Sequence, residues 1–129
     1  MNIDLGGRTA IISGSTGGIG LAIARGLARA NADVVIAGRS QKSLDAAVAE
    51  VRKQGGRGQV HGVVADLGTA AGAETLFAAH PRADILVNNL GIYDDVDFFE
   101  VDDSEWARFY DTNVLSGVRL ARHYAPGMV

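Results

Sequence analysis

The stretch Ser13-Gly14-Ser15-Thr16-Gly17-Gly18-Ile19-Gly20 decides the fold of this chain. It follows a short β-branched run, Arg8 to Ser13, and it opens a segment with helical periodicity, Gly18 to Ala30. A glycine-rich turn between a strand and a helix leaves backbone N–H groups and the positive helix end free of side chains, as a pyrophosphate requires. We therefore expect a phosphate-binding turn, the alternative being a glycine turn that serves only packing.

The rest of the chain repeats the alternation of strand and helix. Apolar runs predict further strands at Asp33–Ala37, Gln59–Ala65 and Asp84–Asn88. Helical spacing predicts a helix capped by Ser40, one from Thr69 to Ala79, and a long one from Ser104 toward Tyr124. This order is typical of a parallel sheet with helices on both faces. The predicted fold class is α/β, a doubly wound parallel sheet of the Rossmann type.

The length of 129 residues suits one domain and is too short for two, so we expect residues 1–129 to form a single domain. A doubly wound sheet ordinarily continues past its switch point, whereas this sequence stops where the last helix would lead into a fifth strand. The fourth strand would then be an open edge. We expect a fold truncated after the fourth strand and its following helix, incomplete at its C-terminus.

Composition narrows the function classes. The net charge of −3 argues against a nucleic-acid partner, and the lack of cysteine excludes a disulfide framework. The start of the chain shows no secretory signal, and the longest uncharged stretch, Thr9 to Ala24, is too short and glycine-rich to cross a membrane. We expect a cytoplasmic protein without a membrane partner.

The glycine spacing resembles that of the short-chain dehydrogenase/reductase family, whose signature is TGxxxGxG, with Ser13 at the threonine position. Four further segments agree in order and spacing: Ala37-Gly38-Arg39-Ser40, Asp66-Leu67, Asn88-Asn89-Leu90-Gly91, and Asn113 between Thr112 and Val114. The resemblance covers nearly the whole chain. It implies an oxidoreductase that exchanges hydride between NADP(H), or NAD as the alternative cofactor, and a small carbonyl or alcohol substrate. The residues it implies for cofactor binding are Ser13, Gly14, Ser15, Thr16, Gly18, Ile19, Gly20, Arg39, Ser40, Asp66, Leu67, Asn89, Leu90 and Gly91.

The end of the second strand bears on cofactor choice. Enzymes that prefer NAD place an acidic residue there to bind the ribose 2′-OH, and this chain has the neutral Gly38. Arg39 can make bidentate contacts to a 2′-phosphate, and Ser40 can add a hydroxyl. This predicts NADP, although Gly17 stands where NADP-preferring family members often have a second basic residue. An arginine merely solvated in a loop is the alternative.

Three other positions take their roles from the resemblance. Asp66 is implied to accept a hydrogen bond from the adenine amino group with help from the Leu67 backbone, and a loop or N-cap carboxylate is equally compatible with the sequence. Leu90 replaces the usual alanine and narrows the implied pocket. Asn113 is the one catalytic-tetrad position present, implied to bend its helix and to hold a water in a proton relay. A buried Asn with a satisfied amide is the alternative.

The remaining tetrad is a serine and a Tyr-x-x-x-Lys pair, whose lysine lowers the tyrosine pKa. The tyrosines here are followed four residues on by other residue types: Tyr93 by Asp97, Tyr110 by Val114, and Tyr124 by Met128. We therefore expect the 129-residue chain alone to be inactive and the catalysis to need a longer chain. Two other functions stay open: a non-catalytic dinucleotide-binding or sensing module, and an S-adenosylmethionine-dependent methyltransferase, which the neutral Gly38 disfavours.

An acidic run precedes and begins the last helix: Asp94, Asp95, Asp97, Glu100, Asp102, Asp103 and Glu105. Its spacing matches no EF-hand loop, and carboxylates are favourable before a helix N-terminus, so we predict no metal site. The last helix has apolar residues on more than one face. We expect a homo-oligomer formed through this helix or through the fourth strand.

Overall fold

The computed structural model describes residues 2–129. Its strands β1 (Thr9–Ile12), β2 (Asp33–Gly38), β3 (Val60–Val64) and β4 (Ile85–Val87) form one parallel sheet in the order β3-β2-β1-β4. The chain builds outward from β1 to β3 and then returns to the other side of β1. The switch point of the sheet therefore lies between β1 and β4, as a doubly wound fold requires.

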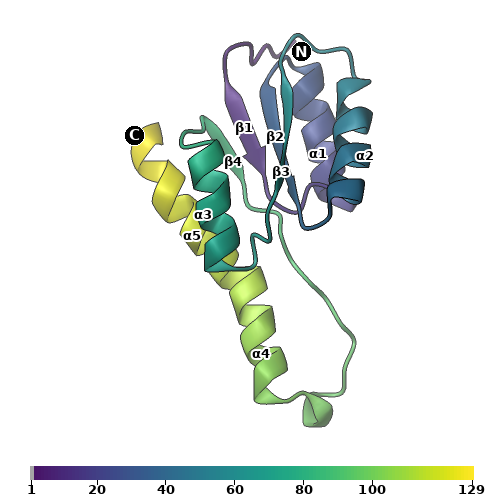
Figure 1. Ribbon diagram of the computed structural model, residues 1–129, viewed down its shortest axis with the longest axis vertical. Coiled ribbons are helices and arrows are strands. Elements are labelled where there is room, and N and C mark those ends of the chain that lie inside the picture. The colour runs from purple at the N-terminus through teal and green to yellow at the C-terminus, as the bar shows by residue number, and fades with distance from the viewer. Residues whose placement is uncertain (1) are drawn as a thin grey trace.

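Helices cover both faces of the sheet. Figure 1 shows α1 (Gly18–Arg29) and α2 (Gln41–Arg52) on one face and α3 (Ala70–Ala79) with α5 (Ser116–Tyr124) on the other. Alternate strand residues divide between two cores: Ile12 and Ile36 pack toward α1 and α2, whereas Ile11 and Val35 pack toward α3 and α5. The predicted fold class is confirmed, and the near-continuous apolar runs of β1 and β2 are explained by burial on both faces.

The strand β4 lies at an edge of the sheet. Within residues 2–129 its only partner is β1, which it meets from Ala10 opposite Ile85 to Ile12 opposite Val87. All three β4 residues are half-buried, whereas β1 and β2 are almost fully buried. The open edge expected from the sequence is present in the described part of the chain.

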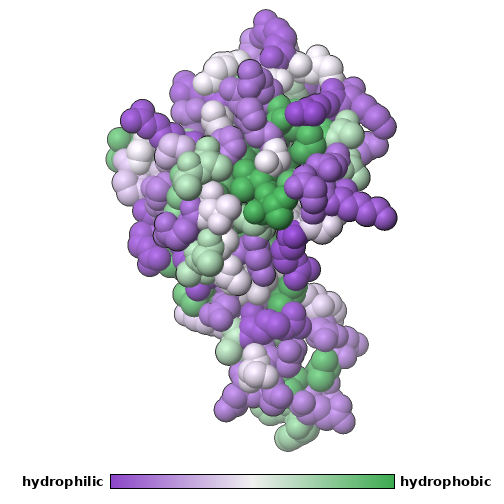
Figure 2. Space-filling model, viewed as in Figure 1, coloured by the Kyte–Doolittle hydropathy of each residue, from purple (hydrophilic) through white to green (hydrophobic). Residues whose placement is uncertain are grey.

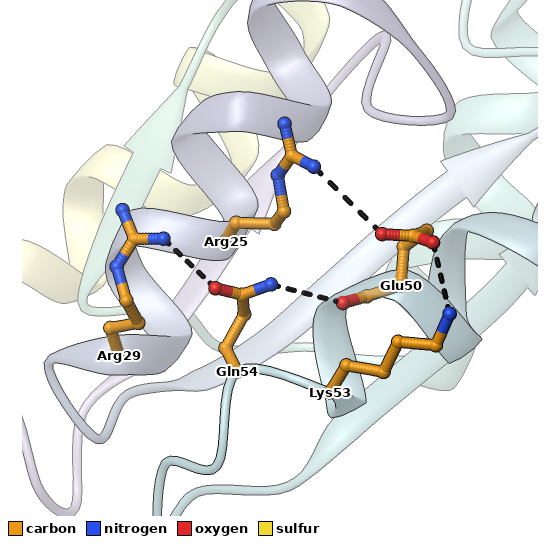
Figure 3. A network of polar contacts seen from close by, with 5 residues as sticks. All are labelled: Arg25, Arg29, Glu50, Lys53 and Gln54. Atoms are coloured by element: carbon orange, nitrogen blue, oxygen red, sulfur yellow. Dashed lines mark hydrogen bonds and ion pairs between the residues drawn. The ribbon is translucent and has the colours of Figure 1, made fainter.

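Polar contacts link α1 and α2 along their exposed sides (Figure 3). Arg25 lies 3.8 Å from a Glu50 carboxylate oxygen, and Arg29 donates a 2.9 Å hydrogen bond to the Gln54 side chain. Exposed pairs of this kind contribute little to stability. The buried alanines, valines and leucines beneath them hold the two helices on the sheet.

Side-chain caps begin three of the helices. Ser40 accepts from the Ser43 N–H at 3.4 Å, Thr69 from the Gly72 N–H at 3.0 Å, and Asp102 from the Glu105 N–H at 2.9 Å. The cap predicted at Ser40 is confirmed. The Ser104 hydroxyl and the Glu105 N–H lower the pKa of Asp102, so this carboxylate stays charged at the positive end of its helix.

The last helix is interrupted, where the sequence predicts one continuous helix from Ser104 toward Tyr124. The structure has α4 (Asp103–Tyr110), a π-helical turn η2 (Asp111–Leu115) and then α5. A short 3₁₀ turn lies on each side of this helical region: η1 (Phe98–Glu100) before it and η3 (Ala125–Met128) after it. The expectation of a continuous α-helix is wrong at the turn that contains Asn113.

Residues 93–110, named the arm below, extend away from the sheet (Figure 1). Apolar side chains lie among polar ones on the arm surface (Figure 2), and the exposed large ones are Tyr93, Val96, Phe98, Phe99, Trp106 and Tyr110. The arm therefore presents apolar surface that the described residues do not cover. Within residues 2–129, no helix is both long enough and apolar enough to cross a membrane.

Candidate functional site

A cleft of about 580 Å³ opens at the carboxyl ends of the strands. The turns after β1, β2 and β3, the segment after β4 and one side of α4 form its walls. The residues predicted to bind cofactor that line it are Gly14, Thr16, Arg39, Asp66, Leu67, Leu90 and Gly91. Segments far apart in the sequence thus meet where ligands bind in open α/β sheets.

The glycines of the turn after β1 are needed for different reasons. Gly14 and Gly18 have φ values of +62° and +54°, the left-handed region that favours glycine. A Cβ on Gly14 would also lie 3.0 Å from the Leu90 Cα. A Cβ on Gly20 would overlap the Gly14 carbonyl oxygen and lie 2.6 Å from the Asn89 Nδ2. Gly20 therefore permits close packing of the turn on α1, a requirement that precedes any clearance for a ligand.

Ser13 and Asn89 tie the turn to the end of β4. The Ser13 Oγ accepts from the backbone N–H groups of Asn89 and Leu90, both at 3.0 Å. The Asn89 Nδ2 donates to the carbonyl oxygens of Ser13 at 3.2 Å and Gly14 at 3.1 Å. These side chains lie between the two segments, so they position the backbone that lines the cleft.

Ser15 performs the same task toward β2. Its side chain is fully buried, and its Oγ accepts a 3.2 Å hydrogen bond from the Ala37 N–H. The turn is therefore fixed to two neighbouring strands by buried hydroxyl groups. A small hydroxyl residue fits at positions 13 and 15 because each must accept a backbone donor within the core.

The first turn of α1 faces outward at the base of this loop. Gly17 is the N-cap and brings no side-chain cap, so the N–H groups of Gly18, Ile19 and Gly20 are left for a ligand or for solvent. Ile19 is 73% exposed, which is unusual for a residue of its size. The structure leaves this helix end unobstructed, in keeping with an anion site.

The end of β2 presents a basic side chain to the cleft. Arg39 is exposed and has no ion-pair partner among residues 2–129. The Ser40 hydroxyl is engaged as the cap of α2. Gly38, which precedes them, has Thr16 as its nearest side chain. Arg39 is thus free to contact a ligand, whereas Ser40 already holds a structural role.

Asp66 and Leu67 shape the loop after β3. The Asp66 Oδ1 accepts from the Gly68 N–H at 2.9 Å, and its backbone carbonyl accepts from Thr69. Leu67 is buried in the core. The Asp66 Oδ2 has no hydrogen-bond partner within residues 2–129. One carboxylate oxygen therefore fixes the loop and the other is left for a ligand, so both interpretations of Asp66 are compatible with the structure.

Asn113 explains the π-helical turn. Its Oδ1 accepts from the Ile92 N–H at 2.7 Å, and its Nδ2 donates to the Ile92 carbonyl at 3.0 Å. Asn113 is exposed, in contrast to the buried alternative considered from the sequence. Its amide has a partner, as an asparagine in mid-helix requires. Such turns recur at functional sites, and this one holds the segment after β4 against the last helix.

One side of α4 lines the cleft and was not anticipated. Ser104, Ala107 and Arg108 of α4 line it, and the stripe continues with Asp111 and Thr112 of η2. They recur at three- and four-residue spacing, which places them on one helix face. That small and polar stripe is a signal the sequence contains. Its meaning depends on knowing that α4 passes the carboxyl end of β3.

The tyrosines lie apart from Lys42 and Lys53 in the part of the chain that the structure describes. The Tyr124 hydroxyl donates a 2.6 Å hydrogen bond to the His80 carbonyl, and burial raises its pKa to about 12. Tyr93 and Tyr110 are exposed on the arm. Lys42 lies on α2 and Lys53 caps its end, on the opposite face of the sheet from Tyr124.

The acidic run lies in the arm and supplies helix caps. Asp97 accepts from the Phe99 N–H at 3.0 Å and begins η1, as Asp102 begins α4. The role predicted for carboxylates before a helix is confirmed. Among the residues that the structure describes, no three His, Cys, Asp or Glu side chains gather as a metal site would need.

Known proteins resemble this chain over its whole length. The model of the short chain dehydrogenase family matches residues 8–129. The uncharacterized oxidoreductase YvaG of Bacillus subtilis (strain 168) is 43% identical over 129 residues, which are 100% of this chain and 49% of YvaG. The chain spans about half the length of the curated relatives it matches.

Solved structures agree in fold. L-sorbose reductase from Gluconobacter frateurii, complexed with NADPH and L-sorbose, superimposes with a TM-score of 0.90 at 34% identity, over 99% of this chain and 50% of that one. A metagenomic short-chain oxidoreductase in complex with NADP gives 0.83 at 34% identity, over 96% and 57%. These relatives have the same arrangement of sheet and helices, and their crystals contain the NADP cofactor.

Proposed function

The chain belongs to the short-chain dehydrogenase/reductase family, and from that premise we propose that it binds NADP(H) as the cofactor-binding part of an oxidoreductase acting on a carbonyl or alcohol. The observation that supports this best is the 580 Å³ cleft, where the glycine turn, Arg39 and Asp66 meet. The methyltransferase alternative has no support from the family match. Of the two solved relatives, one is a complex with NADPH and the other a complex with NADP.

The residues present fit a dinucleotide. The turn at the start of α1 has glycine at its two left-handed positions and no side-chain cap, which suits a pyrophosphate. The neutral Gly38 offers no carboxylate to a ribose 2′-OH, and the unpaired Arg39 offers a charge to a 2′-phosphate. Together these features favour NADP(H) over NAD(H).

The bound cofactor would donate hydride to a carbonyl or accept it from an alcohol, while the protein binds and orients the cofactor. The hydroxyls of Ser13 and Ser15 hold the turn rigid, so that its N–H groups need no rearrangement on binding. Asn113 fixes Ile92, which lines the cleft, and thereby shapes the wall formed by the segment after β4. A ligand bound between the glycine turn and this segment would be oriented by contacts with both.

Titration of the purified protein with NADPH and NADH tests this proposal. We expect tighter binding of NADPH, because Arg39 makes a charge-assisted contact only with the 2′-phosphate. Arg39→Ala removes that contact, which is worth about 1.5–3 kcal/mol, and narrows the NADPH preference by roughly 10- to 150-fold. Lys42→Ala, a charge change on the neighbouring helix, is the matched control. Equal affinities for both cofactors before and after Arg39→Ala would refute the proposal.

A non-catalytic binding or sensing module is the second candidate. Within these 129 residues the tyrosines offer no proton donor of lowered pKa: burial raises the pKa of Tyr124 to about 12, and no tyrosine has a lysine four residues on. A carbonyl-reduction assay decides what the 129 residues do alone, and we expect no NADPH oxidation with small ketones and sugars. Measurable turnover by the purified chain would mean that another group supplies the proton.

We also propose that the chain self-associates through the last helix. The arm is acidic and apolar, whereas α5 has the basic residues Arg119, Arg122 and His123. If the last helices of two copies pack antiparallel, the acidic arm of one copy lies against the basic α5 of the other. Charge complementarity therefore favours a second copy as the partner that covers the exposed arm.

A further inference from the structure

The turn after β1 and the end of β2 meet at one close contact. Gly38 is the last residue of β2, and a Cβ built on it would lie 2.5 Å from the Thr16 Cγ2 and 3.8 Å from the Thr16 Cβ. Carbon atoms in contact sit about 3.5–4.0 Å apart. The methyl group of Thr16 therefore occupies the space that any side chain at position 38 would need.

The backbone around Thr16 is held in place, and its β-branched side chain has few χ1 rotamers. Its neighbours are fixed, because the buried Ser15 Oγ accepts from the Ala37 N–H and the Gly14 carbonyl accepts from Asn89 at 3.1 Å. Moving the whole turn away from β2 would break these hydrogen bonds. A side chain at position 38 thus competes with the Thr16 methyl group directly.

The contact lies where a dinucleotide-binding fold distinguishes its cofactors. A carboxylate at the end of the second strand binds the ribose 2′-OH of NAD. In this protein Thr16, Gly38 and Arg39 all line the same cleft. A carboxylate at position 38 would have to extend from a Cβ placed in the space that Thr16 fills.

We propose that Thr16 is a specificity-determining residue, because its methyl group excludes a side chain from position 38 and keeps the 2′ region open to a phosphate and Arg39. This inference rests on the proposed binding of NADP(H) and deepens it. It predicts that the identities of residues 16 and 38 are coupled. A change of preference toward NAD then requires both positions to change.

The steric part is tested by adding and removing single methyl groups. Gly38→Ala adds only the Cβ, and we expect NADPH affinity to fall about tenfold because the turn is overpacked. Thr16→Ser removes only the Cγ2, and in the double variant it should restore the affinity to within roughly threefold of the unsubstituted protein. Gly26→Ala on α1 is the matched control, since its Cβ would come no closer than 3.8 Å to the Arg29 guanidinium.

The specificity part is tested with a charge. Gly38→Asp alone should lose NADPH affinity and gain none for NADH. Thr16→Ser/Gly38→Asp should bind NADH at least about tenfold more tightly than Gly38→Asp does. Equal NADH affinities for these two variants, or normal NADPH binding by Gly38→Ala, would overturn the inference.

Folding of each variant is followed by thermal unfolding. If Gly38→Ala does not fold and Thr16→Ser/Gly38→Ala does, the conflict between the two residues is supported. If neither folds, Thr16 is not the obstacle and the inference fails. An unsubstituted protein that binds neither dinucleotide refutes the proposed function as well, whereas a normal NADPH preference with additive substitutions refutes this inference alone.

Discussion

The glycine turn, residues 13–20, and the arm, residues 93–110, border the same cleft and are stabilised in opposite ways. The turn is held by hydrogen bonds to Ala37, Asn89 and Leu90, which lie 22 to 77 residues away in the sequence. The side-chain hydrogen bonds of the arm join residues only two or three positions apart. The turn is therefore held in place by contacts with residues that the structure describes.

The difference extends to burial. Ser13 and Ser15 are buried, whereas Phe98 and Phe99 of the arm are 68% and 91% exposed. Phe98 packs edge to face with Phe99 and with Trp106, so these aromatic rings contact each other without reaching the core. A segment with local hydrogen bonds and exposed apolar rings has the surface of an interface. The turn, by comparison, is built as part of the domain interior.

The largest effect is expected at Gly20. Gly20→Ala should weaken dinucleotide binding by about 100-fold or more and lower the melting temperature, because the new Cβ overlaps the Gly14 carbonyl oxygen. Isothermal titration and thermal unfolding measure the two effects. Gly26→Ala, six residues on in the same helix, should instead raise stability by about 0.5–1 kcal/mol. Stabilisation by both substitutions would show that the turn is not held as tightly as its contacts indicate.

The arm should respond through association. We expect concentration-dependent self-association in sedimentation velocity, and Trp106→Glu should weaken it by about 2–4 kcal/mol if this half-exposed ring anchors the interface. Ile3→Glu, which changes an exposed apolar residue outside the arm, is the control. A protein that sediments as a monomer at tens of micromolar would contradict the proposed role of the arm.

The contact between Asn113 and Ile92, which lie just outside the two ends of the arm, is testable by substitution. Asn113→Leu removes both hydrogen bonds to Ile92 and should lower the free energy of unfolding by about 1–2 kcal/mol. Asn113→Asp keeps the acceptor for the Ile92 N–H and loses the donor, so its effect should be smaller. Urea denaturation measures both variants. Equal losses for Leu and Asp would show that the acceptor contributes nothing.

The smallest effect at neutral pH is expected at Tyr124, which lies in the core at the end of α5. Tyr124→Phe removes the hydrogen bond to His80 and should cost about 1 kcal/mol. Folding raises the pKa of Tyr124 from 10.0 to about 12, so folding favours the protonated phenol. That contribution is fully present below pH 10 and is lost as the pH rises toward 12. The unsubstituted protein should therefore lose more stability than Tyr124→Phe between these pH values.

Local patterns predicted most of the framework. Short apolar runs placed all four strands to within a residue or two, and the hydroxyl at Ser40 placed a helix start. These features depend on neighbouring residues, which is why they can be predicted from the sequence. The resemblance also identified Gly14, Arg39 and Asp66, all of which line the cleft.

The roles within the site depend on contacts that no local pattern contains. Ser13, Ser15 and Asn89 were assigned to the cofactor, and the structure has them fixing the turn to its neighbours. The π-helical turn at Asn113 forms because Ile92, 21 residues earlier, offers both backbone groups to one amide. Helical periodicity reflects neighbouring residues only, so it cannot predict a partner 21 residues away.

The π-helical turn also sets the angular phase of two helices that share one axis. Each residue of an α-helix advances the chain by about 100°, so a turn with one residue more rotates everything before it by that angle relative to everything after it. With the turn in place, Ala107, Arg108 and Asp111 face the cleft while Ser116, Leu120 and Tyr124 are buried against the sheet. Deleting one residue between Asp111 and Leu115 would remove the extra residue of the turn and rotate the α4 stripe by about 100° out of the cleft wall. One backbone irregularity thus sets the rotation between two helices, so that α5 packs on the core along one line and α4 borders the ligand cleft along another.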